Sequence, residues 1–440
     1  GSDQYRYHWR TYGHPSRFGY KDIIPLWKAE RFDPYALMNL FVAAGAHYFV
    51  AQAVHHDNFD NFDSTYNRWN AVNMGPKKDI VKLWQDAARL HGLPFGLTEH
   101  LSASFNWFEA NKGCDATGPY AGIPYDGNDP AYEDLYHPNQ GYPLAKDGTW
   151  RWYTDNPWFR RHWFARIKDL IDKYQPDLLY SDGGLPFDEF FHSGQEIVPR
   201  AYLDGELGRR IVAHLYNSSA AIHGENRAVY NQKNCDPSVY TIGVLDIERG
   251  QASEVAEHPW QTDTSVGDWF YNVKDVYKTP QHIVEMLVDI VSKNGNLVLN
   301  IPQRPDGTLD EECTQLLRRM AVWMKDHGEG IFGTRPWTIS GEGATSAGGG
   351  AFKETAAEWT AEDFRFTQKG DTLYAYQMRW SEHGQAVIHA LGKDQSRPVA
   401  AVRLLGAGPL PYTQEADGLH ITLPAQPSAE FIHGFAIDLK

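Results

Sequence analysis

The chain has 440 residues and a mass of 50.0 kDa, and its 42% apolar content is enough to bury a full core, which argues against a disordered protein. Its formal charge of −15 argues against nucleic acid and anionic membranes as partners, because their phosphates would repel it. No apolar run approaches the roughly 20 residues of a membrane helix and no signal peptide opens the chain, so we expect a periplasmic or secreted protein whose leader has been removed, or a cytoplasmic one.

Two features of the composition bear on chemistry. The three cysteines, Cys114, Cys235 and Cys313, are odd in number and far apart, so we expect neither a disulfide framework nor a thiolate metal cluster. Aromatic residues make up 14% of the chain, with 15 Trp and 24 Tyr. Aromatic faces stack on sugar rings but also fill large cores, so this enrichment is only a hint of carbohydrate binding.

From residue 33 onward, helical and strand patterns alternate. Residues 1–20 show no clear period and are predicted to be loop, and the Gly-, Pro- and Tyr-rich segment 102–153 reads as an insertion over the mouth of the fold. Helices are predicted over 34–44, 80–90, 157–174, 207–222, 280–292 and 311–326, and strands over 47–54, 93–97, 178–180, 227–232 and 296–301.

This alternation recurs at least five times without a strand hairpin, which predicts a parallel sheet. The size of this region suits the eight units of a closed barrel, so a (β/α)8-like TIM barrel is favoured over an open doubly wound sheet. No Gly-rich phosphate loop follows any strand, which argues against nucleotide binding. After residue 337 a Gly-rich run gives way to short segments of period two, which predict an antiparallel β-sandwich. We therefore expect a catalytic domain over 1–337 and a C-terminal domain over 338–440.

The stretch PDLLYSDGG contains the first catalytic candidate. Its apolar run ends at Asp182, before a Gly-Gly turn, and the exits of parallel barrel strands are where catalytic groups gather. An Asp at this place can also simply start the turn. As one of the two carboxyl groups that glycoside hydrolysis needs, Asp182 would be the nucleophile.

Histidines and a further acid mark two other strand exits. His55 and His56 follow the strand 47–54, and hydrogen bonds to substrate hydroxyls suit them better than a metal, because adjacent residues of an extended backbone point to opposite sides. Glu99 and His100 end the next strand and could line the same pocket, although Glu99 could equally pair with a basic neighbour.

The partner of Asp182 must come from another strand exit. The acidic stretch 246–257 supplies four candidates, and spacing alone does not choose among them: Asp246, Glu248, Glu254 and Glu257.

Several segments resemble the α-L-fucosidases of glycoside hydrolase family 29. They are HHDNF at 55–59, the stretches 63–70 and 77–81, LPFGL at 93–97, residues 174–183, KNGNLVLNIP at 293–302, DGT at 306–308, and 328–337, all in the family's order. The resemblance has one departure: the family opens with a strand ending in His-Trp-Gly and a later Glu-Trp pair, whereas here His8-Trp9 is followed by Arg10.

The resemblance implies retaining hydrolysis of terminal α-L-fucosyl groups from a fucosylated oligosaccharide or glycoconjugate, without a metal or cofactor. Asp182 matches the nucleophile, His55 and His56 the binders of sugar hydroxyls, and Tyr180 an aromatic beside the nucleophile; Trp69, in the stretch 63–70, would also contact substrate. By position Glu248 is favoured as acid/base, with Glu254 second. The rival readings are a non-catalytic fucose- or glycan-binding protein on the same scaffold and a retaining glycosidase for a related sugar.

Overall fold

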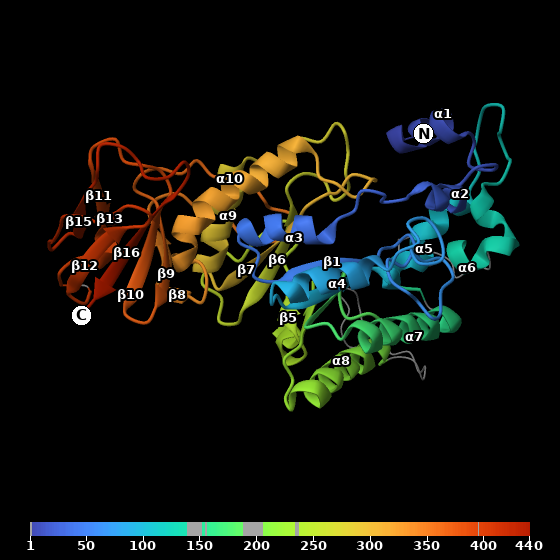
Figure 1. The fold of residues 1–440 in the computed structure, drawn as a ribbon, viewed down its shortest axis with the longest axis horizontal. Coiled ribbons are helices and arrows are strands. Elements are labelled where there is room, and N and C mark those ends of the chain that lie inside the picture. The colour runs from blue at the N-terminus through green and yellow to red at the C-terminus, as the bar shows by residue number, and fades with distance from the viewer. Residues whose placement is uncertain (1, 139–151, 155, 188–205, 234–236, 395) are drawn as a thin grey trace. The chain divides into compact units, whose positions relative to one another are not determined.

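The computed structural model describes residues 2–138, 152–154, 156–187, 206–233, 237–394 and 396–440. The chain divides into two compact units, which Figure 1 draws as one ribbon. The first unit comprises Gly1–Tyr35, His47–Val244 and Pro305–Thr308, and the second comprises Ala36–Ala46, Leu245–Arg304 and Leu309–Lys440.

A parallel sheet forms the centre of the first unit. Its strand order is β1-β2-β3-β4-β5, with β1 at Phe49–Val54, β2 at Phe95–Glu99, β3 at Leu178–Ser181, β4 at Val229–Gln232 and β5 at Val244–Leu245. Leu97 of β2 pairs with Leu179 of β3, which pairs with Tyr230 of β4, and all three side chains are buried. Because the strands run parallel, their carboxyl ends meet at one edge of the sheet.

Two of the three long helices in the described part of this unit, α4 at Ile80–Leu90 and α7 at Pro157–Tyr174, begin at a residue whose side chain caps them. The third is α8 at Leu207–His223, and α7 and α8 lie side by side in Figure 1. The Asp79 carboxylate accepts a hydrogen bond from the Lys82 amide at 2.8 Å, and Asn156 caps α7 in the same way. Trp163 and Ile167, on the apolar face of α7, are fully buried.

The start of the chain differs from its prediction as loop. Asp3–Tyr12 form α1, which contains His8 and Trp9, and Tyr20–Ile23 form α2. No residue of α1 is buried, so the helix lacks the apolar stripe that a periodicity search detects. The short helices of the unit are η1 Ile24–Leu26, η2 Leu101–Ala103, α5 Ser104–Trp107, η3 Phe108–Lys112, η4 Asp126–Asn128, η5 Pro130–Tyr132, α6 Glu133–Tyr136 and η6 Pro237–Thr241.

The second unit contains two further parallel strands and three helices. β6 at Trp260–Ser265 pairs with β7 at Gly295–Asn300, and α9 at Pro280–Ser292 packs beside α10 at Glu311–His327, which η7 at Gly328–Gly330 follows. Most of α3, Pro34–Ala43, also belongs here. The sequence analysis did not predict β6, because it is rich in Thr and Ser, yet most of these polar residues are buried.

The C-terminal part of the second unit is an antiparallel double sheet. One sheet has the order β13-β12-β16-β10-β9-β8 and the other β11-β15-β14. Alternate residues such as Phe364, Phe366, Leu373, Phe435 and Ile437 form its apolar core. The strands are β8 Arg335–Glu342, β9 Phe364–Lys369, β10 Thr372–Gln377, β11 Gln385–Ile388, β12 Val399–Leu404, β13 Gly408–Pro409, β14 Tyr412–Gln414, β15 Leu419–Thr422 and β16 His433–Leu439, and His389–Leu391 form η8.

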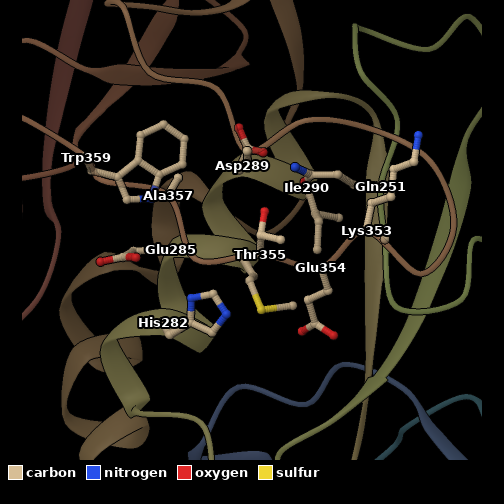
Figure 2. Close-up of a pocket in the computed structure, with 13 residues that line it drawn as sticks. Gln251, His282, Glu285, Asp289, Ile290, Lys353, Glu354, Thr355, Ala357 and Trp359 are labelled. Carbon is tan, nitrogen blue, oxygen red and sulfur yellow. The ribbon is translucent and has the colours of Figure 1, made fainter.

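A pocket of about 400 Å³, including its part open to solvent, lies in the second unit between α9 and the segment that precedes β9 (Figure 2). Polar and charged side chains of both segments line it, among them His282, Glu285, Lys353 and Glu354. The predicted domain boundary after residue 337 falls within β8, and it stays a prediction.

Two further findings concern the described residues. None of their helices is long and apolar enough to cross a membrane. Cys114 is exposed and Cys313 buried, and both are free thiols, while Cys235 lies outside the described residues.

Candidate active site

Asp182 lies directly after β3, at the carboxyl edge of the parallel sheet. Its amide donates a hydrogen bond to the Glu99 carbonyl at 3.1 Å, which continues the pairing of β3 with β2 beyond the end of the strand. Gly183 follows with φ at +93°, and a Cβ there would approach the Trp152 indole nitrogen to 2.8 Å. The Gly in this turn therefore lets Trp152 lie close to the backbone of Asp182.

Cationic and polar groups surround the Asp182 carboxylate. Its Oδ1 accepts a hydrogen bond from Lys233 Nζ at 2.8 Å and one from the Tyr180 hydroxyl at 3.4 Å, and its Oδ2 lies 3.3 Å from His56 Nε2. Burial raises the pKa of Asp182, but His100, His56 and Lys233 outweigh this and hold the pKa well below its ordinary value. Asp182 is thus a buried carboxylate that stays ionised.

The three histidines form one cluster. The His55 ring lies 4.4 Å from that of His56 and 4.5 Å from that of His100, measured between centroids. His56 Nδ1 donates to the His100 carbonyl at 2.6 Å, which fixes the orientation of its Nε2 toward Asp182. Burial, followed by the charges of His100 and His56, lowers the pKa of His55 to about 2, so His55 is neutral and can exchange hydrogen bonds with hydroxyl groups.

One expectation about this pair was wrong. Adjacent residues of a strand point to opposite sides, and His55 and His56 were expected to do so. The structure ends β1 at Val54, so both histidines lie beyond the strand, where the chain turns, and their rings are neighbours.

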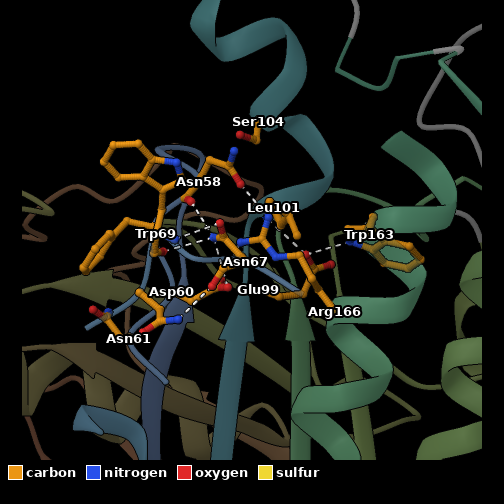
Figure 3. A network of polar contacts seen from close by, with 12 residues as sticks. Asn58, Asp60, Asn61, Asn67, Trp69, Glu99, Leu101, Ser104, Trp163 and Arg166 are labelled. Atoms are coloured by element: carbon orange, nitrogen blue, oxygen red, sulfur yellow. Dashed lines mark hydrogen bonds and ion pairs between the residues drawn. The ribbon is translucent and has the colours of Figure 1, made fainter. Parts of the chain in front are cut away.

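Glu99, at the end of β2, is fully buried and hydrogen-bonded. Its Oε2 accepts hydrogen bonds from the Trp163 indole nitrogen and the Leu101 amide, each at 3.1 Å (Figure 3). Burial raises its pKa, although its polar neighbours Ser181, Trp163 and Leu101 partly counter this. Glu99 thus links the end of β2 to α7, and its contact with substrate stays a prediction.

A buried ion pair supports the turn after the two histidines. Arg166 of α7 donates hydrogen bonds to Asp60 Oδ1 and to Asn58 Oδ1, each at 2.5 Å, and both partners of the ion pair are at most 1% exposed (Figure 3). The Asn67 amide bridges the Asn58 carbonyl and Asp60 Oδ2 from the other side. Because both charges are buried, breaking the pair between Arg166 and Asp60 would cost stability, and the pair therefore holds the turn in place.

Trp69, the predicted aromatic contact, is buried next to this network. Its backbone exchanges hydrogen bonds with the Asn67 side chain, and the Arg68 guanidinium lies 5.0 Å from the centroid of its ring. Its contact with substrate stays a prediction.

Three residues at this edge were not among the site residues predicted from the sequence. Lys233 directly follows β4, so the rule that selected Asp182 could have found it. Trp107 lies 4.5 Å from the His56 ring, and Trp152 packs edge-on against that ring at 5.3 Å. Both tryptophans come from the aperiodic segment 102–153, where only the general aromatic enrichment signalled them.

The acid candidates lie in the second unit, where their surroundings differ. Asp246 is buried and its Oδ2 accepts a hydrogen bond from Gln261 at 2.5 Å, whereas Glu254 and Glu257 are exposed. Glu248 is half-buried, and its carbonyl accepts a hydrogen bond from the Phe352 amide at 2.9 Å.

No group of three or more His, Cys, Asp or Glu side chains in the described part of the chain is arranged to hold a metal ion.

Comparison with known proteins gives one consistent result. The Alpha-L-fucosidase family model matches residues 1–329, and the Alpha-L-fucosidase C-terminal domain model matches residues 357–440. The chain is 28% identical to the plasma alpha-L-fucosidase of Pongo abelii, over 93% of this chain and 76% of that protein. It is 26% identical to the tissue alpha-L-fucosidase of Mus musculus, over 100% of this chain and 86% of that protein.

Solved structures agree on the fold. The alpha-fucosidase of Thermotoga maritima, solved with a mechanism-based inhibitor, aligns with a TM-score of 0.72 and 22% identity over 99% of this chain and 86% of that one. The predicted fold class, a (β/α)8-like catalytic domain with a C-terminal β-sandwich, is confirmed. With the family model covering most of its length, this chain belongs to the alpha-L-fucosidase family of glycoside hydrolases.

Proposed function

We propose that the protein is a retaining exo-α-L-fucosidase that hydrolyses terminal α-L-fucosyl groups of oligosaccharides or glycoconjugates. The observation that carries the proposal is the Asp182 carboxylate, buried at a strand end of a fucosidase-family chain and kept ionised by Lys233 and its histidine neighbours. A fucose complex of the Thermotoga maritima enzyme, at 24% identity, is among the similar structures.

Asp182 is the nucleophile in this proposal. It attacks the anomeric carbon, the bond to the leaving oxygen breaks, and water later hydrolyses the fucosyl ester with net retention. An ionised carboxylate suits both steps, because it needs no deprotonation before attack and leaves as a weak base. Lys233 holds Oδ1 at 2.8 Å, so Oδ2 is the oxygen that we assign to the attack.

The neighbouring aromatic and histidine side chains bind the sugar. His55 is neutral and so exchanges hydrogen bonds with hydroxyl groups without an ion pair. His56, His100 and Tyr180 surround the same carboxylate and contact the ring that it attacks. Glu99 and Trp69 complete the predicted set of substrate contacts from buried positions.

Glu248 is the acid/base that we propose, and Glu254 is the second choice. The acid protonates the leaving oxygen in the first step and, as a carboxylate, takes a proton from water in the second. Glu248 is half-buried and its carbonyl is hydrogen-bonded to the Phe352 amide, whereas Glu254 is exposed. The proposal also includes a periplasmic or secreted location, which the plasma enzyme among the relatives supports.

The test is the release of nitrophenol from 4-nitrophenyl α-L-fucoside. We expect Asp182→Gly to lose at least about 10⁴-fold in kcat, since the covalent step is removed. Azide should restore turnover and give fucosyl azide of inverted configuration, because it enters where the carboxylate stood. The exposed Asp371 offers a matched control, and Asp371→Gly should keep the wild-type rate.

Three outcomes contradict the proposal. Faster turnover of the corresponding galactoside would indicate a glycosidase for a related sugar. Thermal stabilisation by fucose without turnover of any fucoside would indicate a binding protein. Full activity of Asp182→Gly would remove the nucleophile assignment.

A further inference from the structure

The loop that contains Glu248 is hydrogen-bonded on two sides within the second unit. Toward β6, the Ile247 and Arg249 amides donate to the carbonyls of Gln261 and Asp263 at 2.8 and 2.9 Å. These bonds alternate along the loop as in a parallel strand pair, so they fix one edge of its backbone. Glu248 lies between the two bonded residues.

The other edge of the loop is bonded to residues 348–352, which we call the glycine strap. The Phe352 amide donates to the Glu248 carbonyl at 2.9 Å, and the Gly350 amide donates to the Gln251 carbonyl at 2.8 Å. The Gln251 side chain returns a hydrogen bond to the Gly348 carbonyl at 3.1 Å. Both the residue proposed as acid and the end of its loop are thus tied to the strap.

The approach of loop and strap leaves no room for a side chain at Gly250. A Cβ there would lie 2.1 Å from the Gly350 carbonyl oxygen, far inside van der Waals contact, so one of the two backbones would have to move. Phe352 has φ at +56°, which is unfavourable for a residue with a side chain. The hydrogen bond from its amide to the Glu248 carbonyl therefore depends on a strained backbone conformation, which the contacts around Phe352 must hold in place.

The strap is anchored at both ends. Before it, the Thr345 amide donates to Asp363 Oδ1 at 2.9 Å and the Thr345 carbonyl accepts from Arg365 of β9 at 3.1 Å. After it, Glu354 accepts from the Thr264 hydroxyl of β6 at 2.8 Å and pairs with Lys278 at 3.2 Å. The strap therefore connects the C-terminal sheet to the strand beside the Glu248 loop.

The strap borders the pocket of Figure 2. Gly250 and Gln251 of the loop and Lys353, directly after the strap, line this pocket, whereas Ala347 and Trp359 on either side pack on the apolar core that includes Val284 of α9. The Phe352 side chain is 70% exposed. The contact between loop and strap thus depends on a small set of hydrogen bonds and on the close backbone approach at Gly250, which an added methyl group would disturb.

We infer that the glycine strap positions Glu248 for proton transfer to the leaving group, with Gly250, Gly350 and the Phe352 amide as positioning groups. This inference rests on the proposed function, because it takes Glu248 as the acid/base. It gives the segment before β9 a part in catalysis through the position of Glu248. Proton transfer is sensitive to such positioning, since the acid must lie within hydrogen-bond reach of the leaving oxygen.

The test compares Gly250→Ala with the wild type on two aryl α-L-fucosides. The phenyl fucoside has a poor leaving group that needs a proton, and the 2,4-dinitrophenyl fucoside has one that leaves without it. We expect Gly250→Ala to lose about 10- to 100-fold in kcat/KM on the phenyl substrate. This is part of the rate acceleration of about 10²- to 10⁴-fold that a general acid contributes. On the dinitrophenyl substrate its rate should stay within about threefold, because the acid has little to contribute there.

Gly113→Ala is the matched control. It adds the same methyl group to a loop glycine at φ −85°, where the nearest atom would lie 3.7 Å away, so both rates should equal those of the wild type. A second variant, Gln251→Ala, removes only the side-chain bond to the strap and should lose about two- to fivefold on the phenyl substrate alone. It replaces Gly250→Ala if that variant does not fold.

Equal losses on the two substrates, or wild-type rates on the phenyl fucoside, would overturn the inference. Glu248→Ala separates this failure from that of the proposed function. If Glu248→Ala loses the phenyl activity and the strap variants do not, only the strap inference is wrong. If Glu248→Ala hydrolyses both substrates like the wild type, the assignment of the acid is wrong, and the inference about its positioning falls with it.

Discussion

The two proposed catalytic carboxyl groups are held by different means. Asp182 lies among charged and aromatic side chains from four strand ends, with Lys233 and His56 in direct contact. Glu248 lies in a loop whose backbone is hydrogen-bonded to β6 on one side and to the glycine strap on the other. Charges fix both the place and the protonation state of a carboxylate, whereas backbone bonds fix its place alone.

This difference fits the two roles. A nucleophile must be ionised in every free enzyme molecule, so cations around it are useful throughout the cycle. An acid/base must lose and regain a proton in each turnover, and strong fixed charges beside it would stabilise one form too much. We therefore expect substitutions around Asp182 to alter the pH dependence of activity. Substitutions at the strap should instead alter how activity depends on the leaving group.

The largest effect is expected at the buried ion pair behind the histidines. Arg166→Met leaves the Asp60 carboxylate buried without its cation, and removing one partner of such a pair costs about 3–5 kcal/mol. Urea unfolding at pH 7.5 measures this loss of stability. The loss should shrink as the pH is lowered, because Asp60, whose pKa burial already raises, can then become neutral.

Arg68→Met is the control for that measurement. Arg68 pairs with Asp134 in the same part of the first unit, but its side chain is 59% exposed. An exposed pair contributes about 0–1 kcal/mol, so this variant should stay close to the wild type. If the two variants lose equal stability, the buried network does not hold the histidine turn as described.

A smaller effect is expected from Lys233→Met. A hydrogen bond to a charged group contributes about 1.5–3 kcal/mol, so kcat/KM should fall by about 10- to 100-fold. Loss of the cation also raises the pKa of Asp182, which moves the acid limb of the pH profile to higher pH. Lys168→Met, which removes a surface lysine of α7, should leave both the rate and the profile unchanged. An unmoved acid limb in Lys233→Met would show that Lys233 does not keep Asp182 ionised.

The side of the site built from strand ends could be predicted from the sequence. The polar residue that follows an apolar strand is expected to lie at the carboxyl edge of a parallel sheet. This rule selected Asp182, Glu99 and the histidines. It could also have selected Lys233, since the strand predicted over 227–232 ends at the same residue as β4, but Lys233 was not among the predicted site residues.

The acid side could not be predicted in the same way. Four acids lie between residues 246 and 257, and their spacing alone does not choose among them, so only position within the family resemblance favoured Glu248, with Glu254 second. They differ in burial and in backbone partners, which come from β6 and from a strap about 100 residues later in the chain. Such contacts leave no local pattern, just as α1, which buries no residue, left no apolar period.

The smallest effect is the contribution of His55 to the pH dependence of stability. In the unfolded chain its imidazole titrates near its ordinary pKa of 6.5, whereas burial and the neighbouring histidines lower the pKa in the folded protein to about 2. Between these values the unfolded state binds a proton that the folded state does not. Stability is therefore lost as the pH falls below 6.5, by up to about 1.4 kcal/mol per pH unit.

His55→Gln removes this term, so its unfolding free energy should fall less between pH 7.5 and 5 than that of the wild type. Urea titrations at several pH values measure the two slopes. His91→Gln, at an exposed position after α4, should keep the wild-type slope. If the His55→Gln and wild-type curves run parallel, His55 is not held neutral by its neighbours, and a charged imidazolium would have to be placed beside Asp182 in the binding of the sugar.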